Sequence, residues 1–278
     1  MIRSPKWRGC TYKDPTDLGE NPSTYETSPI GYNNFPVSTH IHGLEVRPLF
    51  DGNPLSWFSK KAKGIGYMSL EEKYFDVVTD AEREIIYEYY NTSSQFVKMN
   101  HYPNYQPPGS LWYHDHSMSS TGFNVLKGLS GMYLLRDKKV EKYLPKGNYE
   151  AVVLLHLSGE QKHILSDVTF KTDAYYRFRF LNSHFLKNFP DISFVDPEEN
   201  EIPFTLIGQD SSFMRYPVEL VSFSIASAER IDLLIKFDSL TLKKGDEIKI
   251  AYDNRGQNAV LLTLRIGERE TDPEMLNY

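Results

Sequence analysis

The chain has 278 residues, a length that fits two domains of about 100 to 150 residues each. Its 31 Lys and Arg stand against 37 Asp and Glu, and no basic run is present that would neutralise a series of phosphates. We therefore expect no nucleic-acid partner, and with no apolar run near about 18 residues we expect no membrane segment. The only cysteine, Cys10, excludes an internal disulfide and a thiolate metal cluster.

The first element that carries chemistry is the segment Thr39–Gly43, which reads THIHG. In a β-strand successive side chains point to opposite faces, so His40 and His42 share one face while Ile41 occupies the other. Gly43 follows where a close approach of the backbone is useful. The segment is predicted to present two imidazoles to the same region of space.

Between this pair and the next, Ser69–Tyr90 is rich in Glu and has apolar residues at helical spacing. We predict a helix there, within a long insertion. The rest of the chain shows little helical periodicity, which favours a mainly β fold.

The second histidine pair lies in Trp112–His116, which reads WYHDH. His114 and His116 are expected to share a face across Asp115, with Trp112 and Tyr113 shielding the pair from water. One such pair on an exposed strand is commonly plain surface, whereas two pairs favour a metal site. Several imidazoles without thiolates favour copper or zinc, and the residues alone do not decide between the two metals.

After the second pair, Lys138–Asn148 is polar and contains Pro and Gly, which indicates a linker. We predict two all-β domains, 1–145 and 146–278, each a sandwich or barrel. The predicted strands beyond the linker are short runs rich in Val, Ile, Phe and Tyr, bounded by turn residues: Ala151–Leu157, Tyr175–Leu181, Phe204–Gly208, Ile231–Phe237 and Ala259–Ile266.

The two histidine motifs and their surroundings resemble the first two copper motifs of multicopper oxidases. The branch they resemble contains bacterial spore-coat laccase, bilirubin oxidase and plant ferroxidases. The matching text includes STHIHG, DGNPLSWFSK and HYPNYQPPGSLWYHDHSMSSTGFNVLKGLSGMYLLRD, and later YRFRFLNS and FTLIGQDSSFMRYPVELVSFSIASAERIDLLIKF. The resemblance implies two cupredoxin-like Greek-key domains, with the first sheet incomplete if its early strands are missing.

In that family a trinuclear copper cluster is held by eight histidines from the first and last of three cupredoxin domains. The resemblance implies that His40 binds the type 2 copper and that His116 binds one type 3 copper. It further implies that His42 and His114 share the other type 3 copper, and that the second domain supplies no ligands. Its implied cofactor is copper, and its implied substrates are a phenol or a metal ion together with dioxygen.

The chain departs from the family pattern in the ligands of the third domain. The family's HPxHxH and HCHxxxH patterns, which carry the other cluster ligands and the blue-copper cysteine, do not occur here. We therefore expect the chain alone to be inactive, with a third cupredoxin domain or a partner chain needed to complete the cluster. Four-electron reduction of oxygen requires the whole copper set.

Two other functions remain open at the level of sequence. One is a non-catalytic copper-binding or structural relative that keeps the cupredoxin scaffold. The other is a zinc-dependent hydrolase, since THIHG also resembles the first barrel strand of amidohydrolases, although the second half lacks the alternating helices of such barrels. The remaining histidines and several acidic residues are expected at the surface, in turns or in structural roles: His101, His156, His163, His184, Glu45, Asp51, Asp210 and Asp232.

Overall fold

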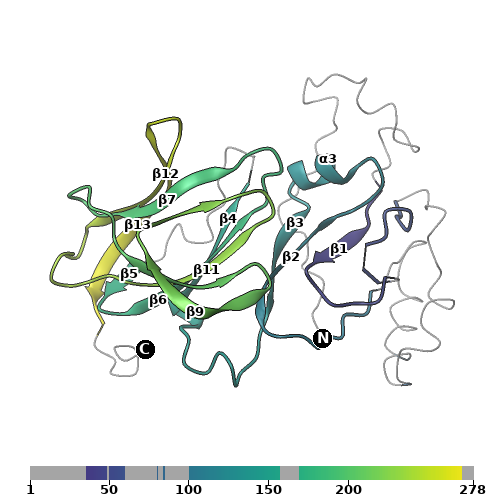
Figure 1. Cartoon of the computed structure of the whole chain (residues 1–278), viewed down its shortest axis with the longest axis horizontal. Coiled ribbons are helices and arrows are strands. Elements are labelled where there is room, and N and C mark those ends of the chain that lie inside the picture. Colours follow the sequence, from purple (N-terminus) through teal and green to yellow (C-terminus); the bar gives the residue numbers. More distant parts are fainter. Residues whose placement is uncertain are drawn as a thin grey trace. The chain divides into compact units, whose positions relative to one another are not determined.

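The computed structural model describes residues 36–48, 50–59, 80, 84, 100–156 and 169–270. The predicted helix Ser69–Tyr90 falls almost wholly outside these residues, as do Cys10 and His163, so their predictions stay untested. Within the described residues nearly all regular structure is β-strand, which confirms the all-β prediction (Figure 1). The described residues contain no helix long and apolar enough to span a membrane.

The chain forms two compact units, of which the first comprises residues 1–105 and 113–130 and the second residues 106–112 and 131–278. Each unit is therefore built from two separate stretches of the chain. The predicted domain boundary between residues 145 and 146 stays a prediction.

Both histidine pairs lie on a three-stranded sheet with the order β1-β2-β3. Its strands are β1 (Thr39–His42), β2 (Gly109–Asp115) and β3 (Ser130–Leu135), and the short helix α3 (Thr121–Leu126) follows β2. The alternation predicted for β1 is present, because Ile41 is 3% exposed on one face while both histidines occupy the other. Gly43, directly after β1, has a φ of 90°, a conformation that favours glycine.

The second unit is a sandwich of two five-stranded sheets that share one hydrophobic core (Figure 1). The sheets have the orders β4-β6-β11-β8-β9 and β10-β7-β12-β13-β5, and their pairs are antiparallel except β4 with β6 and β13 with β5. The strands are β4 (Glu150–Leu155), β5 (Thr169–Thr172), β6 (Tyr175–Asn182), β7 (Phe189–Val195), β8 (Phe204–Gln209), β9 (Ser212–Leu220), β10 (Ser222–Ile225), β11 (Arg230–Lys236), β12 (Glu247–Asp253) and β13 (Asn258–Arg269).

The five strands predicted beyond the linker coincide with β4, β6, β8, β11 and β13 to within a few residues. Their sequence signal was strong because these short runs are rich in aromatic and β-branched residues, which favour strands, and are bounded by turn residues. A mainly antiparallel sandwich lacks the alternating strands and helices of the barrel that the zinc-hydrolase alternative requires. The described residues therefore do not form that barrel, and the fold contradicts the alternative.

The side of β6 that faces away from the hydrophobic core carries a buried set of charges. The Arg177 guanidinium donates to both carboxylate oxygens of Asp232, at 2.8 and 2.6 Å, and to Glu141 at 2.7 Å. Arg179 is fully buried and donates to Glu150 at 2.7 Å and to Glu141 at 2.9 Å. Pairing of every charge offsets much of the cost of removing it from water.

The structure decides between the two roles expected of Asp232, a solvated surface position or pairing between strands. Asp232 on β11 is 3% exposed and pairs with Arg177 on the neighbouring strand β6, so the surface role is wrong and the pairing role is confirmed. Asp210 does lie in a turn, between β8 and β9, where its carboxylate accepts from the Arg230 amide. The predicted linker joins β3 to β4 through turns and the single 3-10 turn η3 (Gly147–Tyr149), and it also supplies the buried Glu141.

Candidate metal centre

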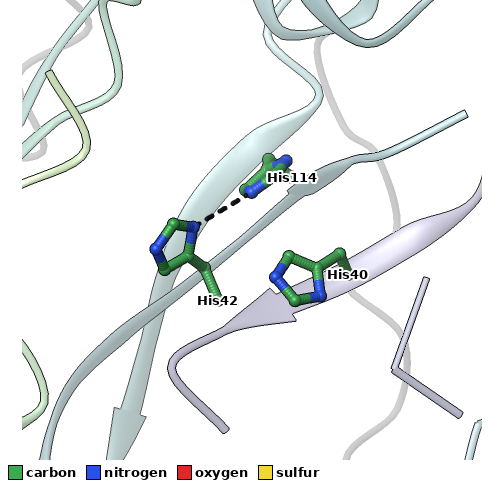
Figure 2. Close-up of side chains that lie close together, drawn as sticks. All are labelled: His40, His42 and His114. Carbon is green, nitrogen blue, oxygen red and sulfur yellow. Dashed lines mark hydrogen bonds between the residues drawn. The ribbon is translucent and has the colours of Figure 1, made fainter. Parts of the chain in front are cut away.

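Four imidazoles from the two predicted pairs, all of them residues of the first unit, gather close together. Ring centroids lie 5.1 Å apart for His40 and His114, 5.2 Å for His40 and His116, and 5.5 Å for His42 and His114. Figure 2 shows His40 and His42 projecting from β1 toward His114 on β2. His42 and His114 are 72 positions apart in the sequence, and the pairing of strand β1 with strand β2 brings them together.

Two of the rings are oriented by main-chain carbonyl groups. Nδ1 of His40 lies 2.6 Å from the carbonyl oxygen of Asp51, and Nδ1 of His114 lies 2.7 Å from the carbonyl oxygen of Asp115. A carbonyl oxygen only accepts, so each Nδ1 carries the hydrogen and donates it. Nε2 of each ring is then the acceptor nitrogen, the atom through which a neutral histidine of this tautomer binds a metal.

His42 differs from His40 and His114, because its Nδ1, and not its Nε2, faces the neighbouring imidazole. Its Nδ1 lies 3.3 Å from Nε2 of His114 (Figure 2). Two imidazole nitrogens bound to one ion at about 2.0 Å, with a tetrahedral angle between them, would be about 3.3 Å apart. The spacing of His42 and His114 therefore matches two ligands of a single metal ion.

Burial sets the charge state of the site. The pKa of His114 is lowered to about 4, first because burial disfavours the imidazolium and then because three other histidines lie close by, despite the hydrogen bond to the Asp115 carbonyl. His114 is therefore neutral near pH 7. Nδ1 of His116 is buried and has no hydrogen-bond partner among the described residues, an arrangement that is costly unless something else satisfies it.

The loop after β1 shapes the site, a role the sequence did not reveal. Asp51, expected at the surface, lies against His40: its Oδ1 is 3.0 Å from Nδ1 of that ring, in addition to the carbonyl contact. A Cβ on Gly52 would come within 2.5 Å of Cβ of His40, and φ of Gly52 is +73°. The DG dipeptide was the available signal, since glycine permits both this conformation and this approach.

The aromatic residues beside the second histidine pair and the histidines outside the two pairs are also located by the structure. Trp112 is 5% exposed on β2, as expected of a residue that excludes water, and burial raises the pKa of Tyr113. His101 packs edge-on against Phe50, with ring centroids 6.0 Å apart. In the second unit, His156 follows β4 and His184 lies between β6 and β7, in the connection that was predicted for it.

The donor set fits copper. Three of the histidines, His40, His42 and His114, have ligand nitrogens within 4.8 Å of one another, and the fourth ring, His116, stacks on His114 at 5.7 Å. Neutral imidazole is a ligand of copper and of zinc, and rings spread over this distance suit more than one ion. The unpartnered nitrogen of His116 also agrees with a cluster that a metal completes.

Comparison with known proteins favours copper over zinc as the metal. The chain is 30% identical over 244 residues to a laccase of Bacillus stratosphericus, covering 72% of this chain and 40% of that protein. It is 25% identical over 250 residues to multicopper oxidase LPR1 homolog 1 of rice, Oryza sativa subsp. japonica, covering 78% of this chain and 38% of that protein. The chain thus spans about two fifths of the curated relatives it matches. No protein-family model matches it.

The fold agrees with the sequence matches. The crystal structure of the McoA multicopper oxidase from the hyperthermophile Aquifex aeolicus superposes with a TM-score of 0.56 at 18% identity, over 84% of this chain and 51% of that chain. That likeness shows a shared all-β, cupredoxin-like architecture, while the relatives of higher identity carry the family assignment. The chain belongs to the multicopper oxidase family.

Proposed function

We propose that His40, His42, His114 and His116 bind copper as the part of a multicopper oxidase cluster that this chain supplies. The observation that carries the proposal is the 3.3 Å approach of His42 Nδ1 to His114 Nε2 within a set of four neighbouring imidazoles. By resemblance to the family, His42 and His114 share one type 3 copper, His116 binds the second, and His40 binds the type 2 copper.

The activity proposed for the whole protein is that of a laccase-like or ferroxidase-like oxidoreductase. Bound copper would supply one-electron chemistry, by which a phenol or a metal ion is oxidised while dioxygen is reduced to water. This chain's part is to present lone pairs: the carbonyl groups of Asp51 and Asp115 hold the Nδ1 hydrogens of His40 and His114 away from the metal side. Trp112, buried on β2, limits access of water.

The remaining cluster ligands are proposed to come from a third cupredoxin domain or a partner chain. The four histidines here account for half of the eight that the family uses, and the two motifs that supply the others do not occur in this sequence. The proposed organisation of this part is two cupredoxin-like domains, residues 1–145 with the copper motifs and residues 146–278 without ligands.

Titration of the metal-free chain with Cu(II), followed by metal analysis after desalting, tests the ligand assignment. We expect fewer than three coppers per chain, because the chain supplies only half of the cluster histidines. We also expect no blue colour, because the motif that carries the blue-copper cysteine does not occur in this sequence. A double variant, His42→Ala with His114→Ala, should lose most of this copper, since it removes both nitrogens of the pair 3.3 Å apart. His184→Ala, in the second unit, is the matched control and should bind copper as the unmodified chain does.

Oxygen uptake with a phenol and with ferrous iron tests the activity. The chain alone is expected to consume no oxygen. Robust turnover by the purified chain would refute the view that it needs further ligands. Copper binding that survives the double histidine substitution would refute the site itself.

A further inference from the structure

A buried carboxylate on the opposite face of β2 from the imidazoles connects the two histidine strands. Asp115 is 4% exposed, and it stands between His114 and His116, so its side chain alternates away from theirs. Its Oδ1 accepts from the main-chain N–H of Ser38 at 2.8 Å. Its Oδ2 accepts from the Ser117 N–H at 3.1 Å and from the Ser117 hydroxyl at 2.6 Å.

Ser38, two residues before His40, is held on all its polar groups. Its N–H donates to Asp115, its carbonyl oxygen accepts from the His116 N–H at 2.8 Å, and its hydroxyl donates to the carbonyl of Asn53 at 2.9 Å. Ser38 is fully buried. Because these bonds run in different directions, they fix both the separation and the register of the two strands at the metal-facing ends.

The same contacts reach the loop that orients His40. Asn53 follows Asp51 and Gly52, the residues whose carbonyl group and missing side chain define the position of the His40 ring. The Met118 N–H, three residues after the end of β2, donates to the carbonyl of Pro54 at 3.0 Å and so also bonds to this loop. One carboxylate thus lies at the junction of β1, β2 and the loop between residues 51 and 54.

We propose that Asp115 is a positioning residue of the metal centre: its carboxylate clips Ser38 to Ser117 and so holds the two histidine pairs at the spacing that copper requires. The inference rests on the proposed copper function of the four histidines. Partners beyond the ligands themselves commonly govern metal affinity in this way.

The test compares two substitutions that remove the clip to different degrees. Asp115→Asn keeps the shape and one acceptor for Ser38, but its amide N–H₂ meets the two Ser117 donors; Asp115→Ala removes every acceptor. Asp173 is the matched control, because it is also buried and accepts from a serine N–H and hydroxyl, those of Ser239, but in the second unit. Asp173→Asn and Asp173→Ala therefore report general destabilisation.

The first measurement uses the copper-free chain. Hydrogen exchange at the His116 amide, which donates to Ser38, should quicken in Asp115→Asn and more in Asp115→Ala, and stay unchanged in the Asp173 variants. The second measurement is Cu(II) affinity by competition with a chelator. Affinity should fall about 10- to 100-fold in Asp115→Ala, less in Asp115→Asn, and not at all in the Asp173 variants.

The outcomes separate this inference from the function on which it rests. If the unmodified chain binds copper and the Asp115 variants bind it equally well, the positioning role is refuted while the copper site stands. If the Asp173 variants lose affinity to the same degree, the effect is general and the role is likewise refuted. If the unmodified chain binds no copper, the proposed function fails, and unchanged amide exchange at His116 would by itself overturn the clip.

Discussion

At the scale of single residues, the geometry of the site depends on atoms that are not themselves metal ligands. Main-chain carbonyl groups bind Nδ1 of His40 and of His114 and so orient both rings, and the absence of a side chain at Gly52 leaves space for His40. Such contacts fix ring orientation, which governs metal affinity as directly as the identity of the ligand does. Substitution of these neighbours is therefore expected to change metal binding without removing any imidazole.

Gly52→Ala is the sharpest such substitution. The added Cβ would lie 2.5 Å from Cβ of His40, a contact that backbone or ring must relieve by moving. We expect Cu(II) affinity to fall by about tenfold or more, in line with the loss of an orienting contact.

A control separates this clash from backbone strain. Gly256 also has a positive φ, of +82°, but no atom lies within 4 Å of its added Cβ. Gly256→Ala should share the cost of about 1–2 kcal/mol for a left-handed residue and keep full copper affinity. Equal affinities in the two variants would contradict the steric role of Gly52.

At the scale of secondary-structure elements, alternation along strands explains both the core and the buried charges. β6 sends Tyr176, Phe178 and Phe180 into the hydrophobic core and Arg177 and Arg179 to its other face. There, Ser110 of β2 accepts from Arg179 at 2.9 Å through its hydroxyl and from Arg230 at 2.8 Å through its carbonyl. The arginines thus fasten the first part of β2 to the sheet that contains β6 and β11.

Asp232→Ala is expected to destabilise the chain by about 3–5 kcal/mol, since it leaves a buried guanidinium without its two-pronged partner. Burial alone would lower the pKa of Arg177, yet the hydrogen bonds and charges of Asp232 and Glu141 raise it, so the guanidinium stays charged. Urea unfolding measures the change. Glu247→Ala, which breaks the exposed pair with Arg265, is the control and should alter the free energy of unfolding little; similar losses in both would refute the importance of burial.

At the scale of the whole molecule, the two units contribute differently. The four imidazoles belong to the first unit, whereas the large hydrophobic core and the arginine network belong to the second. A metal that joins His40 and His42 of β1 to His114 of β2 would therefore add stability to the first unit. Copper is therefore expected to stabilise the folded chain.

Copper should raise the thermal unfolding midpoint of the chain. Free Cu(II) at 100 times its dissociation constant would add about 2.7 kcal/mol to the stability of the folded state. Addition of EDTA should return the midpoint to that of the metal-free chain. The variant that combines His42→Ala with His114→Ala should show no copper-dependent rise, and a rise equal to that of the unmodified chain would speak against these ligands.

The sequence by itself determined the all-β class, five strands of the second unit and the two histidine pairs, because each depends on short local patterns: apolar runs bounded by turn residues for the strands, and alternation for the histidines. It also determined the family, because the copper motifs are short contiguous segments, such as THIHG and WYHDH, that can be recognised without a structure. The tertiary structure alone decided which imidazole nitrogens face one another and that Asp232 is buried. It also revealed the hydrogen bond from the main-chain N–H of Ser38 to the carboxylate of Asp115, 77 positions later in the chain. Such contacts depend on the path of the whole chain, and no local pattern encodes which distant residue will arrive at a given side chain.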